Sequence, residues 1–284
     1  MDRILVATDF SARSDRALRR ATLIAERVGA ALTLAHVVDG DRPARLVAAE
    51  EAAAWSVLEE IARTLRDVDG LAAETLVRVD DVDAGILGAA SEAELQLIVL
   101  GPHRSRLRDV FVGTTVERVV RRTRLPTLVA VQTPSGPYRR TLLALDLDDA
   151  SRTAARKAVE LGVFEHTDVV VMHAFDAPAQ GMMQRAMVSP DMIDDHVDGE
   201  RASAVERLRD LVREVGLPPA GQRVAAMVGS PARTIIEGAA REDAQLVVMG
   251  TNQRKGFERL LIGSVTEDVI RDTHRDILIV PIET

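Results

Sequence analysis

The strongest constraint on the fold of this chain is that its sequence repeats. Residues 4–39 read ILVATDFSARSDRALRRATLIAERVGAALTLAHVVD, and residues 142–176 read LLALDLDDASRTAARKAVELGVFEHTDVVVMHAFD. Both stretches carry an aspartate and a histidine at corresponding places, 137 positions apart: Asp9 and Asp146, His36 and His173. A second match joins AELQLIVLGPHR (93–104) to EDAQLVVMGTNQ (242–253) at an offset of 149, so the second copy carries about a dozen extra residues. The chain is therefore a tandem duplication, and each copy should adopt the same fold.

Each copy alternates short β-branched runs with helical stretches. In the first copy the expected strands are residues 4–8, 32–38, 74–79, 95–100 and 126–131, and helical patterns of roughly 12 to 20 residues separate them. Runs such as ILVA, LIVL, VVVM and LVVM are apolar at consecutive positions. That pattern is typical of parallel strands buried on both faces, with helices on both sides of the sheet.

The predicted fold class is α/β, with two tandem, doubly wound, five-stranded parallel-sheet domains of Rossmann-like type. A helix that ends at Gly29 is predicted from its apolar face, which is formed by Ala17, Leu18, Ala21, Ile24, Ala25 and Val28. QTPSGPYRR (132–140) is rich in turn-forming residues and is interpreted as a linker. We therefore expect one domain over 1–133 and a second over 139–284, related by a pseudo-twofold axis.

Composition excludes several classes of function. The net charge of −8 argues against nucleic acid or an anionic membrane as the main partner. The absence of cysteine excludes disulfides, thiolate catalysis and cysteine-ligated metal sites. MDRILVATDF has neither the charge nor the apolar length of a secretory signal or a membrane span, so a cytoplasmic location is the expected default.

In a doubly wound sheet, ligands bind beyond the carboxyl ends of the strands where the winding direction reverses. The first and fourth strands of each copy end there, at VATD (6–9) and IVLG (98–101) in the first copy and LALD (143–146) and VVMG (247–250) in the second. The loop after the last of these, GTNQRKGFERLLIGSV (250–265), carries glycines before a predicted helix. Such a loop is either a tight turn or a phosphate site, because glycines allow close backbone approach and helix N-termini attract anions.

These features together resemble the universal stress protein family. The residues that carry the resemblance are a first strand ending in Asp, a second ending in a His-Val-like pair, and a fourth-strand loop of the form G-x2-G-x9-G-[ST]. The resemblance covers both halves and implies an adenine nucleotide alpha hydrolase-like fold. In the nucleotide-binding members of that family, the Asp and its neighbours contact adenine, the residue after the His lines the base pocket, and the loop holds ribose and phosphates. The resemblance thus implies ATP or another adenine nucleotide such as AMP, with magnesium as a candidate companion ion.

The second copy matches this pattern better than the first. The residues that the resemblance places at its nucleotide site are Leu145, Asp146, Ala174, Met249, Gly250, Asn252, Gln253, Gly263, Ser264, Val265 and Thr266. Gln253 departs from the pattern, because it stands where the second glycine is expected and adds bulk where backbone and phosphate nearly touch.

The first copy departs further and is interpreted as a degenerate site. Its corresponding residues are Thr8, Asp9, Val37, Gly101, His103, Arg104, Gly113 and Thr114. Arg104 replaces the second glycine, and the distance from Gly101 to Gly113 is one residue short. The arginines of PHRSRLRD could recruit an anion by charge, or they are solvated surface residues.

Several of these residues have alternative structural roles. Asp9 and Asp146 could cap the following helices, and Thr114 and Ser264 are good helix caps with or without a phosphate. His36 and His173 are expected to be structural, since no partner stands at metal-ligand spacing, and no metal site is predicted.

No catalytic residues are predicted. The chain lacks a Walker A motif, a G-x-S-x-G elbow and an HExxH pair, so it is not expected to be an enzyme, although slow ATP hydrolysis or autophosphorylation stays open. The favoured function is a stress-response module that binds nucleotide, mainly in the second half, and meets an unknown protein partner. The alternative is a nucleotide-free scaffold that works through protein–protein interaction.

Two further expectations concern contacts. PTLVAV (126–131) and DILIVPI (276–282) should pair at the pseudo-twofold axis, which makes the chain an intramolecular pseudo-dimer, with a homodimer as a further option. Residues 177–196 hold four of the eight methionines and form either a lid or partner surface, or a helix packed into its own core.

Overall fold

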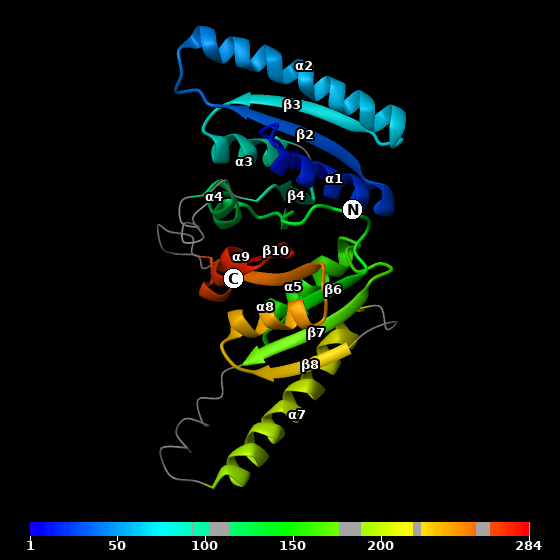
Figure 1. Ribbon diagram of the computed structural model, residues 1–284, viewed down its shortest axis with the longest axis vertical. Helices are drawn as coiled ribbons and strands as arrows, with labels where there is room; N and C mark the ends of the chain where they lie inside the picture. The colour runs from blue at the N-terminus through cyan, green and yellow to red at the C-terminus, as the bar shows by residue number, and fades with distance from the viewer. Residues whose placement is uncertain (93, 103–113, 176–188, 218–222, 254–261, 284) are drawn as a thin grey trace.

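The computed structural model has one continuous ten-stranded sheet with helices on both faces (Figure 1). It describes the chain except for residues 93, 103–113, 176–188, 218–222, 254–261 and 284. The molecule is elongated, and both termini lie near the middle of its long axis (Figure 1).

The first half follows the expected alternation of strands and helices. Its elements are β1 (Arg3–Ala7), α1 (Ala12–Val28), β2 (Ala31–Val38), α2 (Ala44–Val68), β3 (Ala73–Val79), α3 (Val82–Glu92), β4 (Leu97–Leu100), α4 (Thr115–Arg122) and β5 (Thr127–Val129). Helix α1 ends at Gly29, as predicted, because that residue adopts a left-handed conformation with φ of 71° that favours glycine.

The second half repeats the same order. Its elements are β6 (Arg140–Ala144), α5 (Asp149–Glu160), β7 (Asp168–Phe175), α7 (Pro190–Glu214), β8 (Arg223–Val228), α8 (Pro231–Arg241), β9 (Leu246–Gln253), α9 (Ser264–Asp272) and β10 (Asp276–Glu283). The prediction of two five-stranded, doubly wound parallel units is confirmed, since the strand order is β3-β2-β1-β4-β5 in one half and β10-β9-β6-β7-β8 in the other.

The two halves join through their last strands. β5 and β10 pair antiparallel, with Leu128 opposite Leu278 and with Val129 and Thr127 opposite Ile277 and Ile279. Every other strand pair is parallel within its half. The predicted pairing of these strands at a pseudo-twofold axis is therefore confirmed. It also buries two edges that would otherwise invite association.

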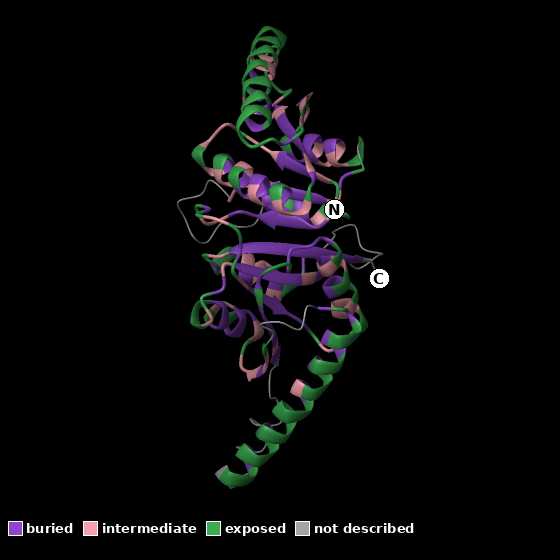
Figure 2. Cartoon of the chain, turned by 90° about the vertical axis from the view of Figure 1, so that its right-hand side faces the viewer, coloured by how far each residue is buried: buried purple, intermediate pink, exposed green. Residues whose placement is uncertain are grey.

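The helices divide between the two faces of the sheet. Helices α1, α2, α5 and α7 cover one face, where the core contains Ala21, Leu58, Ala155 and Leu208. Helices α3, α4, α8 and α9 cover the other, with Ile86, Val119, Ile235 and Val269 in the core. Figure 2 shows the buried strands between layers whose outer surfaces are exposed, and α7 extending well beyond the sheet.

Candidate functional site

In each half, the first and fourth strands lie side by side, so their carboxyl ends form one crevice. β1 pairs with β4 in the first half, and β6 pairs with β9 in the second. In the second half Ala144 lies opposite both Met172 of β7 and Met249 of β9. The residues that follow these positions, Asp146, Ala174 and Gly250, are thereby brought to the same end of the sheet, as expected for a topological switch point.

The structure places most of the second-half candidates around this crevice. Leu145, Ala174, Met249 and Thr266 are buried, Gly250 and Val265 are half-buried, and Asp146, Gly263 and Ser264 are exposed. The Thr266 hydroxyl donates to the Gly250 carbonyl over 3.4 Å, which links the start of α9 to the end of β9. The side chains of Asn252 and Gln253 lie outside the described residues.

The backbone at Gln253 explains part of its departure from the glycine pattern. β9 continues as a strand to Gln253, which lies opposite Glu283 of β10. Extended backbone suits any residue, so a glycine is not required at this position by conformation. In the first half β4 ends earlier, at Leu100, and Arg104 lies outside the described residues.

The two strand-end aspartates differ in their surroundings. The Asp9 carboxylate accepts hydrogen bonds from the Ser11 backbone N–H, over 3.1 Å, and from the Ser11 hydroxyl. Burial alone would raise the pKa of Asp9, but hydrogen bonds from Ser11 and Ser14 and the charge of Arg13 together lower it. Asp9 thus stabilises the loop that follows it. The N-cap of α1 is Ser11 and not Asp9.

Asp146 has no such local partner. The N-cap of α5 is Asp148, whose carboxylate accepts from the Ser151 N–H over 2.7 Å, and Asp146 contributes only its backbone N–H, which donates to the Ser151 hydroxyl over 2.9 Å. Within the described residues the Asp146 carboxylate accepts no hydrogen bond, and its Oδ1 lies 3.8 Å from His173 Nδ1. Burial raises the pKa of Asp146, while the charge of His173 opposes that rise. A ligand donor would find this carboxylate available.

The two histidines are structural anchors of the crevice. His36 Nδ1 lies 2.8 Å from the Thr8 carbonyl, and His173 Nδ1 lies 2.8 Å from the Leu145 carbonyl. A carbonyl oxygen can only accept, so Nδ1 carries the proton in both halves. Each histidine therefore fixes the end of the first strand against the second, as the sequence analysis expected. Within the described part of the chain there is no cluster of residues able to hold a metal ion.

The glycines at the ends of the fourth strands are required by packing. A Cβ on Gly101 would lie 2.8 Å from the Arg13 carbonyl oxygen in α1, and a Cβ on Gly250 would lie 2.9 Å from Ala154 Cβ and 2.7 Å from Ile282 Cδ1. A larger residue at either position would force these neighbours to shift, so packing favours glycine at both. Their presence is thus explained without a ligand.

Gly263 is different. It is the N-cap of α9 with φ of −58°, and among the described residues the nearest atom to an added Cβ is Thr266 Oγ1 at 4.0 Å. Packing and conformation therefore permit a larger residue. In the first half the helix start is instead capped by Thr114, which is buried and whose hydroxyl accepts from the Glu117 N–H over 3.1 Å. Thr114 thus has the capping role that the sequence analysis offered as its alternative.

The described part of the first half also forms a cavity at its crevice, of about 630 Å³. Four residues of the predicted degenerate site line it: Thr8, Asp9, Val37 and Gly101. They do so together with residues that were not selected from the sequence: Phe10, Arg13, Asp39, Arg42 and Glu50. The Phe10 ring stacks on His36 with centroids 4.4 Å apart. The one sequence feature that could have identified Phe10 as a site residue is its position directly after Asp9. The half with the predicted degenerate site therefore has a cavity at its crevice. His103 and Gly113, two further residues of that predicted site, lie outside the described residues.

Comparison with known proteins agrees with this geometry. The model of the universal stress protein family matches residues 1–131 and 137–281, which is nearly the whole chain, in two copies. The chain belongs to the universal stress protein family.

A tandem relative supports the same assignment over the full length. A universal stress protein of Mycolicibacterium smegmatis is 28% identical over 297 residues, covering 98% of this chain and 96% of the relative. A universal stress protein of Methanocaldococcus jannaschii is 29% identical over 144 residues, covering 50% of this chain and 82% of the relative. The crystal structure of a universal stress protein from Archaeoglobus fulgidus superposes with a TM-score of 0.73 at 17% identity, covering 98% of each chain. That last likeness concerns the fold.

The expectation about the methionine-rich segment of this universal stress protein falls partly outside the described residues. Of the segment 177–196, the residues up to 188 are not described, and the remainder begins α7 at Pro190. Met192 is 62% exposed, so this methionine does not pack into a core, whereas Ile193 and Val197 are buried.

Among the helices of the described residues, none has the length and apolar character needed to cross a membrane.

Proposed function

We propose that this universal stress protein is a regulatory module that binds an adenine nucleotide, ATP or AMP, mainly in its second half. The observation that carries the proposal is Gly263. Neither its φ angle nor its packing against the described residues requires a glycine, and it stands where the family resemblance places the phosphates. A glycine here leaves the first amides of α9 open to an anion, which the helix N-terminus favours.

The end of the crevice opposite Gly263 has the side chains that an adenine base would need. The Asp146 carboxylate is exposed and accepts no hydrogen bond within the described residues, so it can accept from an exocyclic amino group. Ala174 and Met249 are buried beside it and offer an apolar floor. Adenine would rest on that floor, with its ribose and phosphates directed toward Gly263, Ser264 and Thr266. Magnesium would be held mainly by the phosphates.

In this account the protein acts by binding rather than by turnover. A nucleotide that contacts both the end of β9 and the start of α9 stabilises one arrangement of these two elements over others. Its binding therefore shifts the conformational equilibrium of the chain and changes which surface is available to a protein partner. The first half, where Asp9 is committed to Ser11 and Thr114 to Glu117, would bind nucleotide more weakly.

A nucleotide-free scaffold is the competing function. It is favoured by one observation: packing alone accounts for Gly101 and Gly250, two of the glycines that suggested phosphate binding. In that case the crevice belongs to the fold and binds no nucleotide, and the function lies in contacts with other proteins.

Calorimetric titration of ATP with magnesium distinguishes the two. We expect one site of micromolar affinity in the unmodified chain, weakened at least about tenfold, or 1.4 kcal/mol, by Gly263→Arg and by Asp146→Ala. The matched control is Gly199→Arg, an exposed glycine of α7 where an added Cβ meets no atom within 4 Å. Binding that survives Gly263→Arg would place the site elsewhere, and no heat in any protein would favour the scaffold.

A further inference from the structure

A groove between α1 and α2 in the first half lies away from the nucleotide crevice. It encloses about 620 Å³, within the range of ligand-binding sites in proteins. Its residues recur with helical spacing on both helices: Asp15, Leu18, Arg19, Thr22, Leu23 and Glu26 from α1, and Glu60, Ile61, Thr64, Leu65 and Asp69 along α2 and at its C-cap. From Asp15 to Glu26 the α1 wall is about 16 Å long, at a rise of ~1.5 Å per residue.

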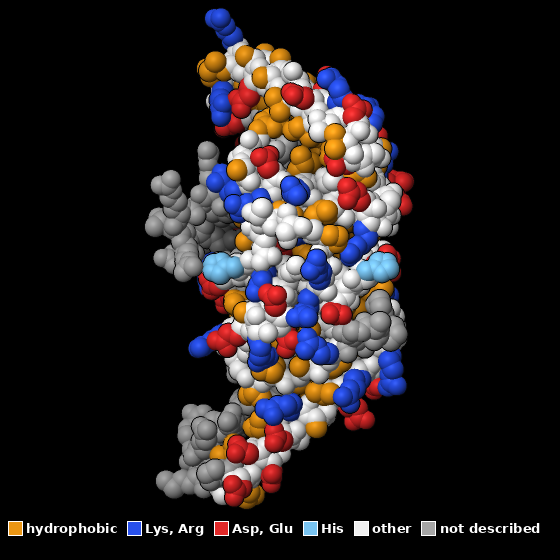
Figure 3. All heavy atoms as spheres, turned by 45° about the vertical axis from the view of Figure 1, so that its right-hand side comes forward, with side chains coloured by type: hydrophobic (Ala, Val, Ile, Leu, Met, Phe, Trp, Pro, Cys, Tyr) orange, Lys and Arg blue, Asp and Glu red, His pale blue; other side chains and the backbone are white. Residues whose placement is uncertain are grey.

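The groove has an apolar floor and an acidic rim. Leu65 is buried and Leu18, Leu23 and Ile61 are half-buried, whereas Asp15, Glu26, Glu60 and Asp69 are exposed. None of these four carboxylates forms an ion pair within the described residues, and Arg19 is the one cation among the lining residues. Figure 3 shows hydrophobic side chains in the hollow below α2, near the top of the view, with acidic side chains around it.

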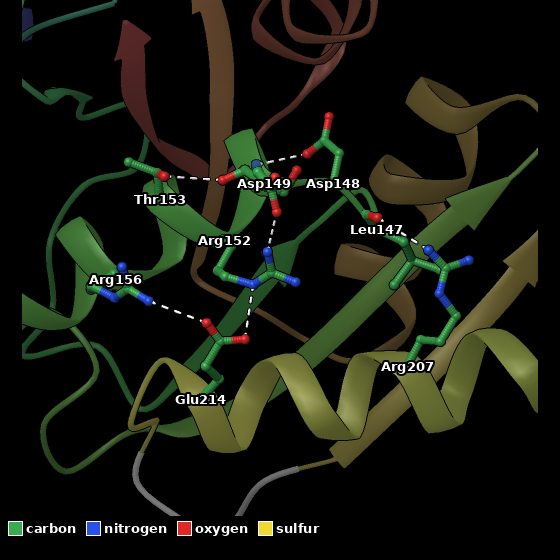
Figure 4. A network of polar contacts seen from close by, with 9 residues as sticks. Leu147, Asp148, Asp149, Arg152, Thr153, Arg156, Arg207 and Glu214 are labelled. Carbon is green, nitrogen blue, oxygen red and sulfur yellow. Dashed lines mark hydrogen bonds and ion pairs between the residues drawn. The ribbon is translucent and has the colours of Figure 1, made fainter. Parts of the chain in front are cut away.

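In the second half, ion pairs bridge the corresponding helices α5 and α7. Arg152 Nε of α5 lies 2.9 Å from Glu214 Oε2 of α7, and Arg156 Nη2 lies 3.4 Å from Glu214 Oε1 (Figure 4). Arg207 of α7 donates to the Leu147 carbonyl over 3.2 Å (Figure 4).

The positions of the two halves correspond through the repeat. Asp15 stands where α5 has Arg152, by the same offset of 137 that relates Asp9 to Asp146. Helices α2 and α7 align through Gly70 and Gly216, which both have left-handed φ just beyond the helix ends. This alignment places Val68 where Glu214 stands and Ile61 where Arg207 stands. Val68 is 76% exposed, so the first half has an exposed apolar residue where the second half has the bridging acid.

We propose that the α1–α2 groove binds an amphipathic helical segment of a partner protein, with an apolar stripe flanked by lysine or arginine. The floor offers the apolar contacts of helix-in-groove recognition, and the unpaired rim carboxylates match flanking cations. The length of the α1 wall corresponds to about three helical turns of such a segment. At the corresponding positions the second half has Arg152 in place of the rim residue Asp15 and Arg207 in place of the floor residue Ile61, so we expect it to bind the same segment more weakly.

The test uses a short, fluorescently labelled peptide of leucine and lysine whose leucines follow the helical period, and a second in which glutamate replaces lysine. In fluorescence anisotropy at low salt, the lysine peptide should bind and the glutamate peptide should not. Glu60→Lys should weaken binding about fivefold, and the pair Asp15→Arg with Val68→Glu, which copies the bridge of the second half, more than about tenfold. Glu206→Lys, the same charge change at the corresponding exposed position of α7, should leave the affinity within about twofold.

Circular dichroism and thermal unfolding of each variant exclude loss of fold as the cause. The proposal is overturned if the peptide does not bind, if both peptides bind alike, or if Glu206→Lys weakens binding as much as Glu60→Lys, which would indicate attraction to net charge alone. Sedimentation velocity of the chain without peptide adds one more outcome. Self-association that Glu60→Lys abolishes would make the groove an interface between two copies and would likewise overturn the partner proposed.

Discussion

Arg20 and Asp276 form a buried ion pair across the boundary between the two halves, with Nε 2.9 Å from Oδ2 and side chains 4% and 0% exposed. Residues of the linker between the two halves add further contacts to this ion pair. The Tyr138 hydroxyl donates to Asp276 Oδ2 over 2.7 Å, the Gln132 N–H donates to Asp276 Oδ1 over 2.8 Å, and the Arg20 guanidinium lies 3.9 Å from the centre of the Tyr138 ring. Burial and the charge of Asp276 raise the pKa of Tyr138 well above 10.0, so its hydroxyl stays protonated and donates.

Replacing Asp276 by Ala should therefore destabilise the chain by about 3–5 kcal/mol, because Arg20 is left as an uncompensated buried charge. Tyr138→Phe should cost less, about 1–2 kcal/mol, since it removes one hydrogen bond and keeps the ring. The control is Asp272→Ala on the exposed part of α9, which should change stability by under about 1 kcal/mol. Urea unfolding followed by fluorescence of the single tryptophan, Trp55, reports the first half. Equal losses in Asp276→Ala and Asp272→Ala would show that the buried pair contributes nothing specific.

Two of the crevice glycines, Gly101 and Gly263, should respond differently to a single methyl group. Gly101→Ala places a Cβ against the rigid Arg13 carbonyl and should cost about 1–3 kcal/mol. Gly263→Ala meets open space and should change the free energy of unfolding by less than about 0.5 kcal/mol, while lowering ATP affinity about tenfold. Thermal unfolding and calorimetry on the same preparations separate the two effects. A destabilised Gly263→Ala variant would mean that its glycine is structural after all.

The two strand-end aspartates should have opposite effects on pH-dependent stability. Asp9 has a lowered pKa in the folded chain, so its ionised form stabilises the fold above the ordinary value of 3.8, and this contribution disappears as the pH falls through the folded pKa. Asp146 has a raised pKa, so its ionised form is unfavourable in the fold above 3.8, and that penalty disappears below it.

Asp9→Asn should consequently lower the midpoint of thermal unfolding at pH 7, and Asp146→Asn should raise it, each by about 1–3 °C at these exposed positions. The difference for Asp146→Asn should shrink as the pH is lowered toward 4, whereas the difference for Asp9→Asn should persist to about pH 4 and shrink only below 3.8. Differential scanning calorimetry across this range measures them. Shifts of the same sign in both variants would contradict the surroundings described for the two carboxylates.

The sequence predicted the architecture because the duplication and the runs of apolar residues are local signals. The end of α1 at Gly29 and the pairing of residues 126–131 with 276–282 both follow from such patterns and from the rule that strand edges are covered. The Arg20–Asp276 pair could not be predicted, since its members lie 256 positions apart and nothing in either neighbourhood identifies the other.

The candidate site was predicted less completely, and for a physical reason. Gly101, Gly250 and Gly263 look alike in a motif, yet only the packed structure shows that helices crossing the strand ends require the first two and leave the third unconstrained. Asp9 and Asp146 are likewise equivalent in the repeat. They differ because a serine follows Asp9 two positions later, where Asp148 follows Asp146 and turns its carboxylate to the helix start instead.

To learn whether the second half holds an adenine nucleotide, freshly purified protein can be denatured and any released nucleotide identified by mass spectrometry. We expect about one adenine nucleotide per chain, retained in Gly199→Arg and lost in Gly263→Arg. Protein that releases no nucleotide, and that also gives no heat with ATP and magnesium, would contradict nucleotide binding and leave the scaffold as its function.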